Sequence, residues 1–326
     1  MKIAVFSPNW VGDATLSLPF INMLKSQNSE SEIIVVCKDW VAPVYQKNPN
    51  IDNIISFSSK ELKGTINTIK KGLYLRKQKI DLFYTLTDSL RSALIMWLSK
   101  AKNRIGYRSQ MRTIFLTSTL RLPLAGLHRS NKYLNLIGID NLEYTDKYIF
   151  ISKDEIEWAK EKLKKHNIKN FVALFPFSIS SSRTFPKNKI KEWITDSKKQ
   201  YIIFGADSDK NEALNIVSQN RNNSIHSFCG DITLRKCIAL ISLADYALAA
   251  DSGLGHISSI IGVSTVSFFG AKRSVTTRPI GNNIILDKSE RCEPCKKNIC
   301  CLNVITKSDI DSVSYTHLTL PTTPYV

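Results

Sequence analysis

The feature that most constrains the fold is a regular alternation of short strand-like runs with longer helical patterns along the first half of the chain. The strand-like runs are Lys2–Ser7, Glu32–Cys37 and Asp81–Thr87, and helical patterns begin near Ala14 and Ser89 and cover the basic amphipathic stretch Ile66–Lys79. Parallel strands need a crossover connection, usually a helix, so this alternation is typical of a parallel sheet wrapped by helices.

The second half of the chain repeats the same pattern. Its strand-like runs are Phe171–Phe177, Tyr201–Ala206, Tyr246–Ala250 and Ser264–Gly270, with helical patterns at Lys153–Lys165, Asp209–Ser218 and Thr233–Ser242. A chain of 326 residues can bury two cores of ordinary size. We therefore predict an α/β fold of two doubly wound Rossmann-like domains, residues 1–147 and 148–312, which face a cleft. Ligands of such sheets bind at the carboxyl ends of the strands, so the loops there are the candidate sites.

The composition favours a cytoplasmic protein. The chain contains no run of about 18 apolar residues, so no membrane span is predicted. Asp13 interrupts the apolar N-terminus, which argues against a signal peptide. The seven cysteines do not have the pattern of a secreted disulfide scaffold. Four of them form a Cys-x-x-Cys followed by a Cys pair: Cys292, Cys295, Cys300 and Cys301. No second well-spaced pair completes a zinc pattern, so reduced thiols are favoured over a structural metal.

The chain carries a formal net charge of +17, which favours an anionic partner. Nucleic acid, anionic lipid and phosphorylated sugar all qualify, and the alternative is that the lysines only solvate the surface. No sequence signature of base recognition accompanies the charge, so we do not expect a nucleic-acid partner.

The last fourteen residues, Val313–Val326, differ in composition from the rest. They carry no charge and are rich in Thr and Pro, and they resemble a translated sequencing adapter. We expect the native part of this sequence to stop near Ser312, short of the true C-terminus, with Val313–Val326 outside the fold. A disordered tail is the alternative.

Three loops carry candidate chemistry. In the first, Gly12 would let the backbone turn and Asp13 would stand at a helix N-terminus, where a carboxylate is stabilised and can accept a proton. A simple helix cap is the other interpretation of Asp13. The second loop, Asp251–His256, would present the amides of Ser252 and Gly253 to a pyrophosphate, while His256 is a ligand contact or a packed residue. The third, Ser180–Pro186, combines hydroxyls with Arg183, a residue suited to phosphate.

Taken in order, these loops resemble the heptosyltransferases of glycosyltransferase family 9 over residues 1–312. The similar segments are PNWVGDATLSLPF, TDSLRSALIMWLSKAKNRIGYRSQMR, FGADSDKNEA, CGDITLRKCIALISLADYALAADSGLGHISSIIGV, FFGAKRSVTTRP and CEPCKKNICC. The segment that begins TDSLRS resembles the second enzyme of that family's pathway most. The sequence departs from the family at Pro176-Phe177-Ser178, where a Pro-Gly-Ala turn is usual, and at Arg183 and Phe185, where the family has Lys and Trp.

The resemblance implies a GT-B fold and the transfer of heptose from ADP-heptose, with inversion, to the Kdo-modified lipid A core at the inner face of the inner membrane. It implies that Asp13 is the general base and that no metal or other cofactor is needed. The implied donor-binding residues are Ser181, Ser182, Arg183, Asp251, Ser252, Gly253, Leu254, Gly255 and His256, with Thr276 and Thr277 in a further loop. The implied acceptor-binding residues are Asn9, Trp10, Gly12, Ser89, Arg91 and Ser92. The alternatives are a family member that transfers another sugar or to another position, and a non-catalytic nucleotide-sugar-binding protein.

Overall fold

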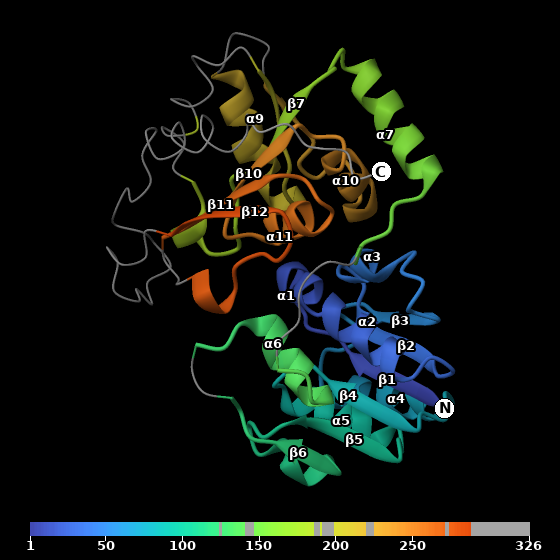
Figure 1. Cartoon of the computed structure of the whole chain (residues 1–326). Coiled ribbons are helices and arrows are strands. Elements are labelled where there is room, and N and C mark those ends of the chain that lie inside the picture. Colours follow the sequence, from blue (N-terminus) through green and yellow to red (C-terminus); the bar gives the residue numbers. More distant parts are fainter. Residues whose placement is uncertain are drawn as a thin grey trace. The chain divides into compact units, whose positions relative to one another are not determined.

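The computed structural model divides the chain into two compact units, Met1–Phe150 and a second that begins at Ile151. It describes residues 1–123, 126–140, 147–185, 190, 199–219, 225–270 and 274–287. The cysteine cluster and Val313–Val326 therefore lie outside the described residues. Figure 1 shows the two units, each built on a twisted sheet with helices around it. In the described part of the chain, no helix is both long enough and apolar enough to cross a membrane.

The first unit contains a six-stranded sheet in the order β3-β2-β1-β4-β5-β6, with all strands parallel. The strands are β1 (Lys2–Phe6), β2 (Glu32–Lys38), β3 (Asn53–Phe57), β4 (Leu82–Thr85), β5 (Asn103–Tyr107) and β6 (Ser118–Leu120). The helices are α1 (Val11–Leu16), α2 (Leu18–Gln27), α3 (Ala42–Tyr45), α4 (Thr65–Arg76), α5 (Leu90–Leu98) and α6 (Arg129–Leu134), with 3₁₀ turns η1 (Arg112–Phe115) and η2 (Asn135–Ile137).

The second unit has a parallel sheet of the same topology, in the order β12-β11-β10-β7-β8-β9. Its strands are β7 (Phe171–Phe175), β8 (Gln200–Ile203), β9 (Ile225–Ser227), β10 (Tyr246–Ala250), β11 (Thr265–Phe269) and β12 (Asn283–Asp287). The helices are α7 (Lys153–Lys165), α9 (Lys210–Ser218), α10 (Leu234–Ile241) and α11 (Gly253–Ile260), with 3₁₀ turns η3 (Ser181–Arg183), η4 (Asp207–Asp209) and η5 (Ser274–Thr276).

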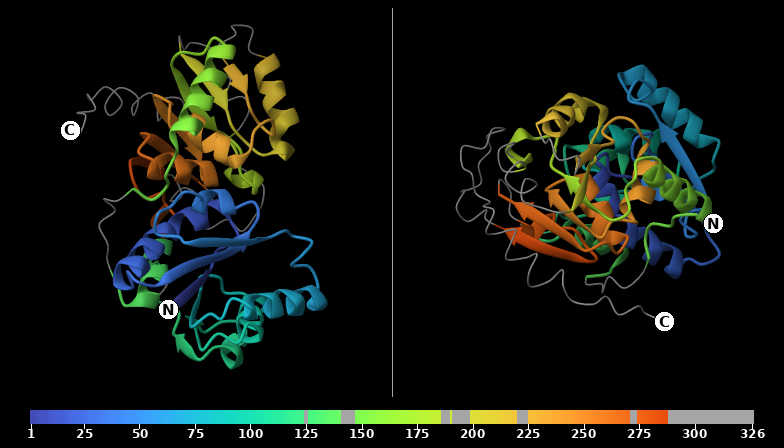
Figure 2. Two further views of the ribbon diagram at one scale, coloured as in Figure 1. Left: turned by 90° about the vertical axis from the view of Figure 1, so that its right-hand side faces the viewer. Right: turned by 90° about the horizontal axis from the view of Figure 1, so that it is seen from above.

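The cores explain why these strands read as continuous apolar runs. All five residues of β7 are buried, and successive side chains enter different cores. Val172 and Leu174 pack into one cluster, whereas Phe171, Ala173 and Phe175 pack into another on the opposite face. A sheet covered by helices on both faces, as the views in Figure 2 show for each unit, leaves no polar side to its central strands.

In both sheets, the order in which strands are added reverses at the first strand. The chain runs from β1 to β2 and β3 on one side, then crosses to β4 on the other side of β1. The second sheet reverses in the same way between β7 and β10. Ligands of doubly wound sheets bind at this switch point, beyond the carboxyl ends of the two neighbouring strands. The loops after β1 and β4, and after β7 and β10, are therefore the places to look for a site.

A partly buried ion pair holds the first helix of the second unit. Ser152 precedes α7, and its backbone N–H donates to Glu155 Oε2 at 2.8 Å. Both carboxylate oxygens of Glu155 also accept from Arg235 of α10, at 2.5 and 2.8 Å. Burial alone would raise the pKa of Glu155, but the hydrogen bonds from Arg235 and Ser152 lower it to about 2. The pair thus joins α7 to α10.

We predict that Glu155→Gln lowers the free energy of unfolding by about 2 kcal/mol at neutral pH, because it removes charge-assisted hydrogen bonds. A carboxyl whose pKa is lowered by folding stabilises the fold at pH values above its pKa in the unfolded chain, and this stabilisation is lost as the pH falls towards its pKa in the folded protein. The difference from wild type should therefore shrink between pH 4.5 and about 2. Urea unfolding at several pH values measures it. Glu157→Gln, an exposed position on the same helix, is the control, and an equal loss in both variants would contradict the prediction.

Candidate active site

The loop after β1 begins α1 without a turn at Gly12. Trp10 is the N-cap residue, with an extended backbone, and Gly12 is the second residue of the helix. The expectation that Gly12 turns the backbone is therefore wrong, because the chain already bends at Asn9 and Trp10, before the helix begins. Trp10 is 55% exposed, and the carbonyl of Asn9 accepts a hydrogen bond from the indole N–H of Trp40 at 2.8 Å. An exposed aromatic ring thus lies three residues before Asp13 in the chain.

Asp13 lies in the first turn of α1 and does not cap it, since no side chain caps this helix. Its carboxylate instead forms an ion pair with Arg129 of α6, at 3.6 Å from Nη1 to Oδ2. The Asp13 side chain is 21% exposed and that of Arg129 is 38% exposed. Burial would lower the pKa of Arg129, but the charge of Asp13 and a bond to Tyr133 raise it overall. A carboxylate that solvent can reach, held by a cation, is the arrangement expected of a positioned base.

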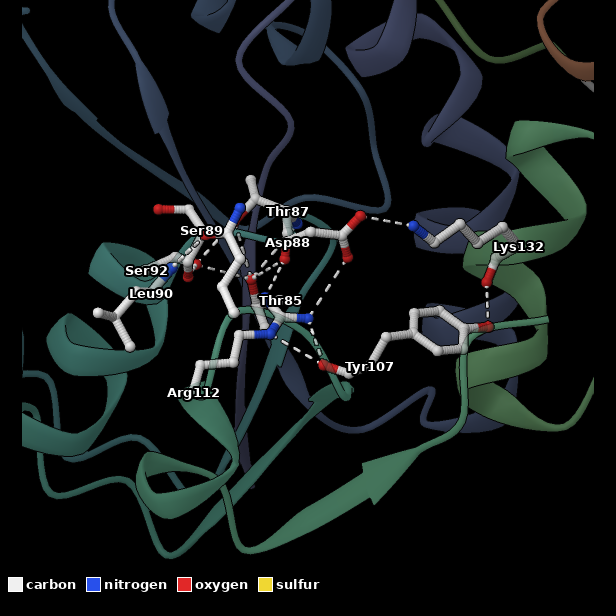
Figure 3. A network of polar contacts seen from close by, with 10 residues as sticks. Thr85, Thr87, Asp88, Ser89, Leu90, Ser92, Tyr107, Arg112 and Lys132 are labelled. Atoms are coloured by element: carbon white, nitrogen blue, oxygen red, sulfur yellow. Dashed lines mark hydrogen bonds and ion pairs between the residues drawn. The ribbon is translucent and has the colours of Figure 1, made fainter. Parts of the chain in front are cut away.

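Helix α6 also contacts a second carboxylate at the same end of the strands. Figure 3 shows Asp88, in the loop after β4, between Lys132 and Arg112. The distances from its carboxylate are 2.7 Å to Lys132 Nζ and 3.5 Å to Arg112 Nη2. Arg129 and Lys132 are three residues apart and so lie near one face of α6. This one helix therefore contacts the acidic residues that follow both β1 and β4.

Arg112 is fully buried and organises the loop around Asp88. Its guanidinium donates to the carbonyl of Tyr107 at 2.9 and 2.6 Å, and also to the carbonyl of Thr87. Burial lowers the pKa of Arg112, while the charge of Asp88 opposes this. Sequence reasoning missed Arg112, Asp88, Arg129 and Lys132. The signal for the first two was their place inside the segment that begins TDSLRS, which resembles the family.

The three residues at the start of α5 have different surroundings. Ser89 caps α5, and its hydroxyl accepts from the Arg91 N–H at 3.1 Å. Arg91 is exposed. Ser92 is buried, with its hydroxyl bonded to the Ser89 carbonyl at 2.7 Å and to the Thr87 hydroxyl at 2.7 Å (Figure 3). Ser92 thus fixes the loop, whereas Arg91 is open to solvent.

In the second unit, the loops after β7 and β10 are joined by an ion pair. Arg183 Nη1 lies 3.1 Å from Asp251 Oδ2, and the Asp251 side chain is only 8% exposed. The hydroxyl of Ser178 donates to the backbone carbonyl of Asp251 at 3.0 Å. The Nε of Arg183 is buried and has no hydrogen-bond partner within the described residues. The structure therefore brings together Arg183 and Asp251, which sequence reasoning had placed in separate loops.

The loop that carries Arg183 is closed by its own backbone. The N–H of Phe185 donates to the carbonyl of Pro176 at 2.8 Å, and the N–H of Ser178 donates to the hydroxyl of Thr184 at 3.1 Å. Phe185 is buried and contacts Phe268 edge to face. The side chains of Ser180 and Ser182 are hydrogen-bonded at 2.8 Å. The Ser181 side chain lies outside the described part of the structure. This closed loop holds Arg183 at the end of the sheet.

Asp251 is followed by the N-terminus of α11. Ser252 caps the helix, and its hydroxyl accepts from the Gly255 N–H at 3.5 Å. Gly253 and Leu254 open the helix, where backbone N–H groups have no intrahelical acceptor. A Cβ on Gly255 would lie 2.8 Å from the Cβ of Ala249, so only glycine lets α11 pack this closely on β10. These amides, together with Arg183, form a site suited to an anion.

Two further positions in the second unit complete the description. His256 is buried within α11, and Thr277 follows η5 with its hydroxyl buried and without a hydrogen-bond partner within the described residues. Within those residues, no group of three or more His, Cys, Asp or Glu side chains could hold a metal ion.

Comparisons with known proteins agree with this architecture. Residues 69–305 match the family model described as glycosyltransferase family 9 (heptosyltransferase). The chain is 22% identical to lipopolysaccharide heptosyltransferase 2 of Escherichia coli K12 over 300 residues, which cover 86% of each chain. It is 26% identical to lipopolysaccharide heptosyltransferase 3 of the same strain over 291 residues, 84% of each.

Solved structures show the same fold. The E. coli ADP-heptose LPS heptosyltransferase II structure superposes with a TM-score of 0.77 at 21% identity, over 88% of this chain and 90% of that one. A family 9 glycosyltransferase from Veillonella parvula gives a TM-score of 0.83 at 21% identity, over 97% of each chain. The expected GT-B fold, with two Rossmann-like domains, is thereby confirmed. With a family model matched over more than half of its length, this chain belongs to glycosyltransferase family 9, the heptosyltransferases.

Proposed function

We propose that the chain transfers heptose from ADP-heptose to the Kdo-containing inner core of lipid A, at the inner face of the inner membrane. The observation that carries the proposal is a charged pair at the switch point of each sheet: Asp13 with Arg129 in the first unit, and Arg183 with Asp251 in the second. The first offers a base and the second an anion site. Acceptor activation and departure of a nucleotide need these two functions.

In the proposed reaction, Asp13 accepts the proton of the acceptor hydroxyl while that oxygen attacks the anomeric carbon of heptose. The bond from this carbon to the ADP oxygen breaks in the same displacement, so the anomeric centre is inverted. Arg183 and the amides of Gly253 and Leu254 stabilise the charge that develops on the departing ADP. Fixed cationic and N–H groups thus perform the role that a metal ion has elsewhere, and no cofactor is required.

The other residues of the two switch points support these roles. Arg129 holds the Asp13 carboxylate in one orientation. Exposed Trp10 and Arg91 offer an aromatic face and a cation to an acidic sugar acceptor. His256, buried within α11, and Thr277, whose hydroxyl has no hydrogen-bond partner among the described residues, are proposed as further contacts to the nucleotide sugar. The cationic surface suits an acceptor that carries carboxylates and phosphates.

We predict that Asp13→Asn lowers kcat by about 10²–10⁴-fold while the affinity for ADP stays nearly unchanged, because a positioned base is lost and the donor site is not. Steady-state kinetics with ADP-heptose and a defined Kdo-lipid A acceptor, followed by mass spectrometry of the product, measure this. A turnover within about threefold of wild type would exclude Asp13 as the base. Wild-type binding of ADP-heptose with no product would favour the non-catalytic alternative.

Arg183→Ala should weaken ADP binding by about 1.5–3 kcal/mol, since a charged hydrogen-bonded contact is lost and Asp251 stays buried without its cation. Calorimetric titration with ADP checks this. In the Arg183→Ala and Asp251→Asn double variant, part of the lost affinity should return, because the uncompensated carboxylate that repels phosphate is gone. If Arg183→Ala binds ADP like wild type, Arg183 does not contact the donor.

Arg129→Ala should lower kcat more than it changes KM for either substrate, because it frees the Asp13 carboxylate to rotate without removing the base. Arg129→Lys should restore most of the rate, since a cation is again within reach of Asp13. Equal losses in the Lys and Ala variants would show that Arg129 acts through its own hydrogen bond to Tyr133 instead. The melting temperatures of both variants provide the check on folding.

A further inference from the structure

Helix α4 exposes an apolar stripe to solvent. Ile66, Ile69 and Leu73 are spaced three and four residues apart and so share one side of the helix. Their side chains are 71%, 40% and 47% exposed, respectively. The opposite side is buried at Thr68, Gly72 and Leu75. An amphipathic helix normally turns its apolar side to the core, so a second apolar side that faces solvent requires another explanation.

Further exposed apolar side chains lie on the segments that pack against α4. Helix α4 packs closely on α5, because a Cβ on Gly72 would lie 2.4 Å from the Cβ of Leu98. Helix α5 in turn packs on η1, and Trp97 contacts Phe115 with ring centroids 5.8 Å apart. Trp97 is 41% exposed and Ile114 is 79% exposed. We call these five exposed side chains the α4–α5–η1 surface: Ile66, Ile69, Leu73, Trp97 and Ile114. The two views in Figure 2 place α4 at the outer edge of the first unit.

The sequence around this surface is strongly cationic. Lys63–Ile80 contains six lysines and arginines and no acidic residue, and Ser89–Ile139 contains nine and again none. The acidic residues between these two segments are Asp81 and Asp88, and each is paired with a lysine at 2.7 Å. The partner of the surface should therefore be anionic. It should also accept large apolar side chains, which a nucleic acid backbone does not.

An anionic lipid leaflet combines these two properties. Apolar side chains of an interfacial helix enter the boundary between headgroups and acyl chains, and nearby lysines gain roughly 1 kcal/mol each from anionic headgroups. We propose that the α4–α5–η1 surface docks the first unit on an anionic bilayer. The proposed function explains the use of such docking, because a lipid-linked acceptor would be met there, but the docking itself requires no catalysis.

Sedimentation of the full chain with lipid vesicles tests the proposal. The chain should bind vesicles that contain phosphatidylglycerol, bind those of phosphatidylcholine alone much more weakly, and lose affinity as salt screens the charges. The double variant Ile69→Ser and Leu73→Ser should bind anionic vesicles at least about tenfold more weakly, because it removes two inserting apolar side chains. Leu214→Ser on α9, at a position 49% exposed in the second unit, is the matched control and should bind like wild type.

Two outcomes would overturn the proposal: equal vesicle affinity of the double variant and the Leu214→Ser control, or no binding of wild type to anionic vesicles. A lower mass of the double variant in analytical ultracentrifugation, without vesicle binding by wild type, would assign the surface to a second copy of the chain. Transfer to a detergent-dispersed acceptor does not need a bilayer. It tests the proposed function alone, so the two ideas can fail separately.

Discussion

The reversal of strand order in each parallel sheet is the constraint on which the rest of the structure depends. Right-handed crossovers on the two sides of the first strand place helices on opposite faces. The loops after β1 and β4 therefore leave the sheet on either side of a switch point, as do those after β7 and β10. Each candidate charge lies in such a loop or contacts it. The two halves of the chain differ in sequence, yet in both the candidate residues lie at the switch point of the sheet.

In the first unit, helix α6 converts this topology into a defined geometry. Its cations Arg129 and Lys132 contact Asp13 and Asp88, which follow adjacent strands. The hydroxyl of Ser130, between them, donates to the carbonyl of Leu16 at 2.8 Å and ties α6 to α1. A carboxylate on a short loop would otherwise sample many orientations. The packing of α6 offsets the loss of conformational entropy when the carboxylate is held in one orientation, although α6 itself is not part of the sheet.

The sequence was sufficient to predict the fold, but it did not reveal the ion pairs that the loops at the strand ends form. Runs such as Tyr246–Ala250 could be recognised because a strand buried on both faces must be apolar throughout. Strand β12 was missed because all its residues are only half-buried, and β6 because it has three residues. Arg112 could not be foreseen as buried, since its partners are mostly backbone carbonyls, which no sequence pattern displays.

The contact between Arg183 and Asp251 explains how a guanidinium can be held at the end of a buried strand. An isolated guanidinium at the end of a buried strand would be costly, and Asp251 compensates its charge. Arg183 Nε is buried without an acceptor within the described residues, and leaving a buried donor unpaired costs about 1–3 kcal/mol in general. A phosphate oxygen that reaches Nε would recover this energy, whereas a neutral ligand without an acceptor would not. Asp251 thus compensates the charge of Arg183, and Nε is a hydrogen-bond donor with no acceptor among the described residues, so an anionic ligand would be favoured over a neutral one at this strand end.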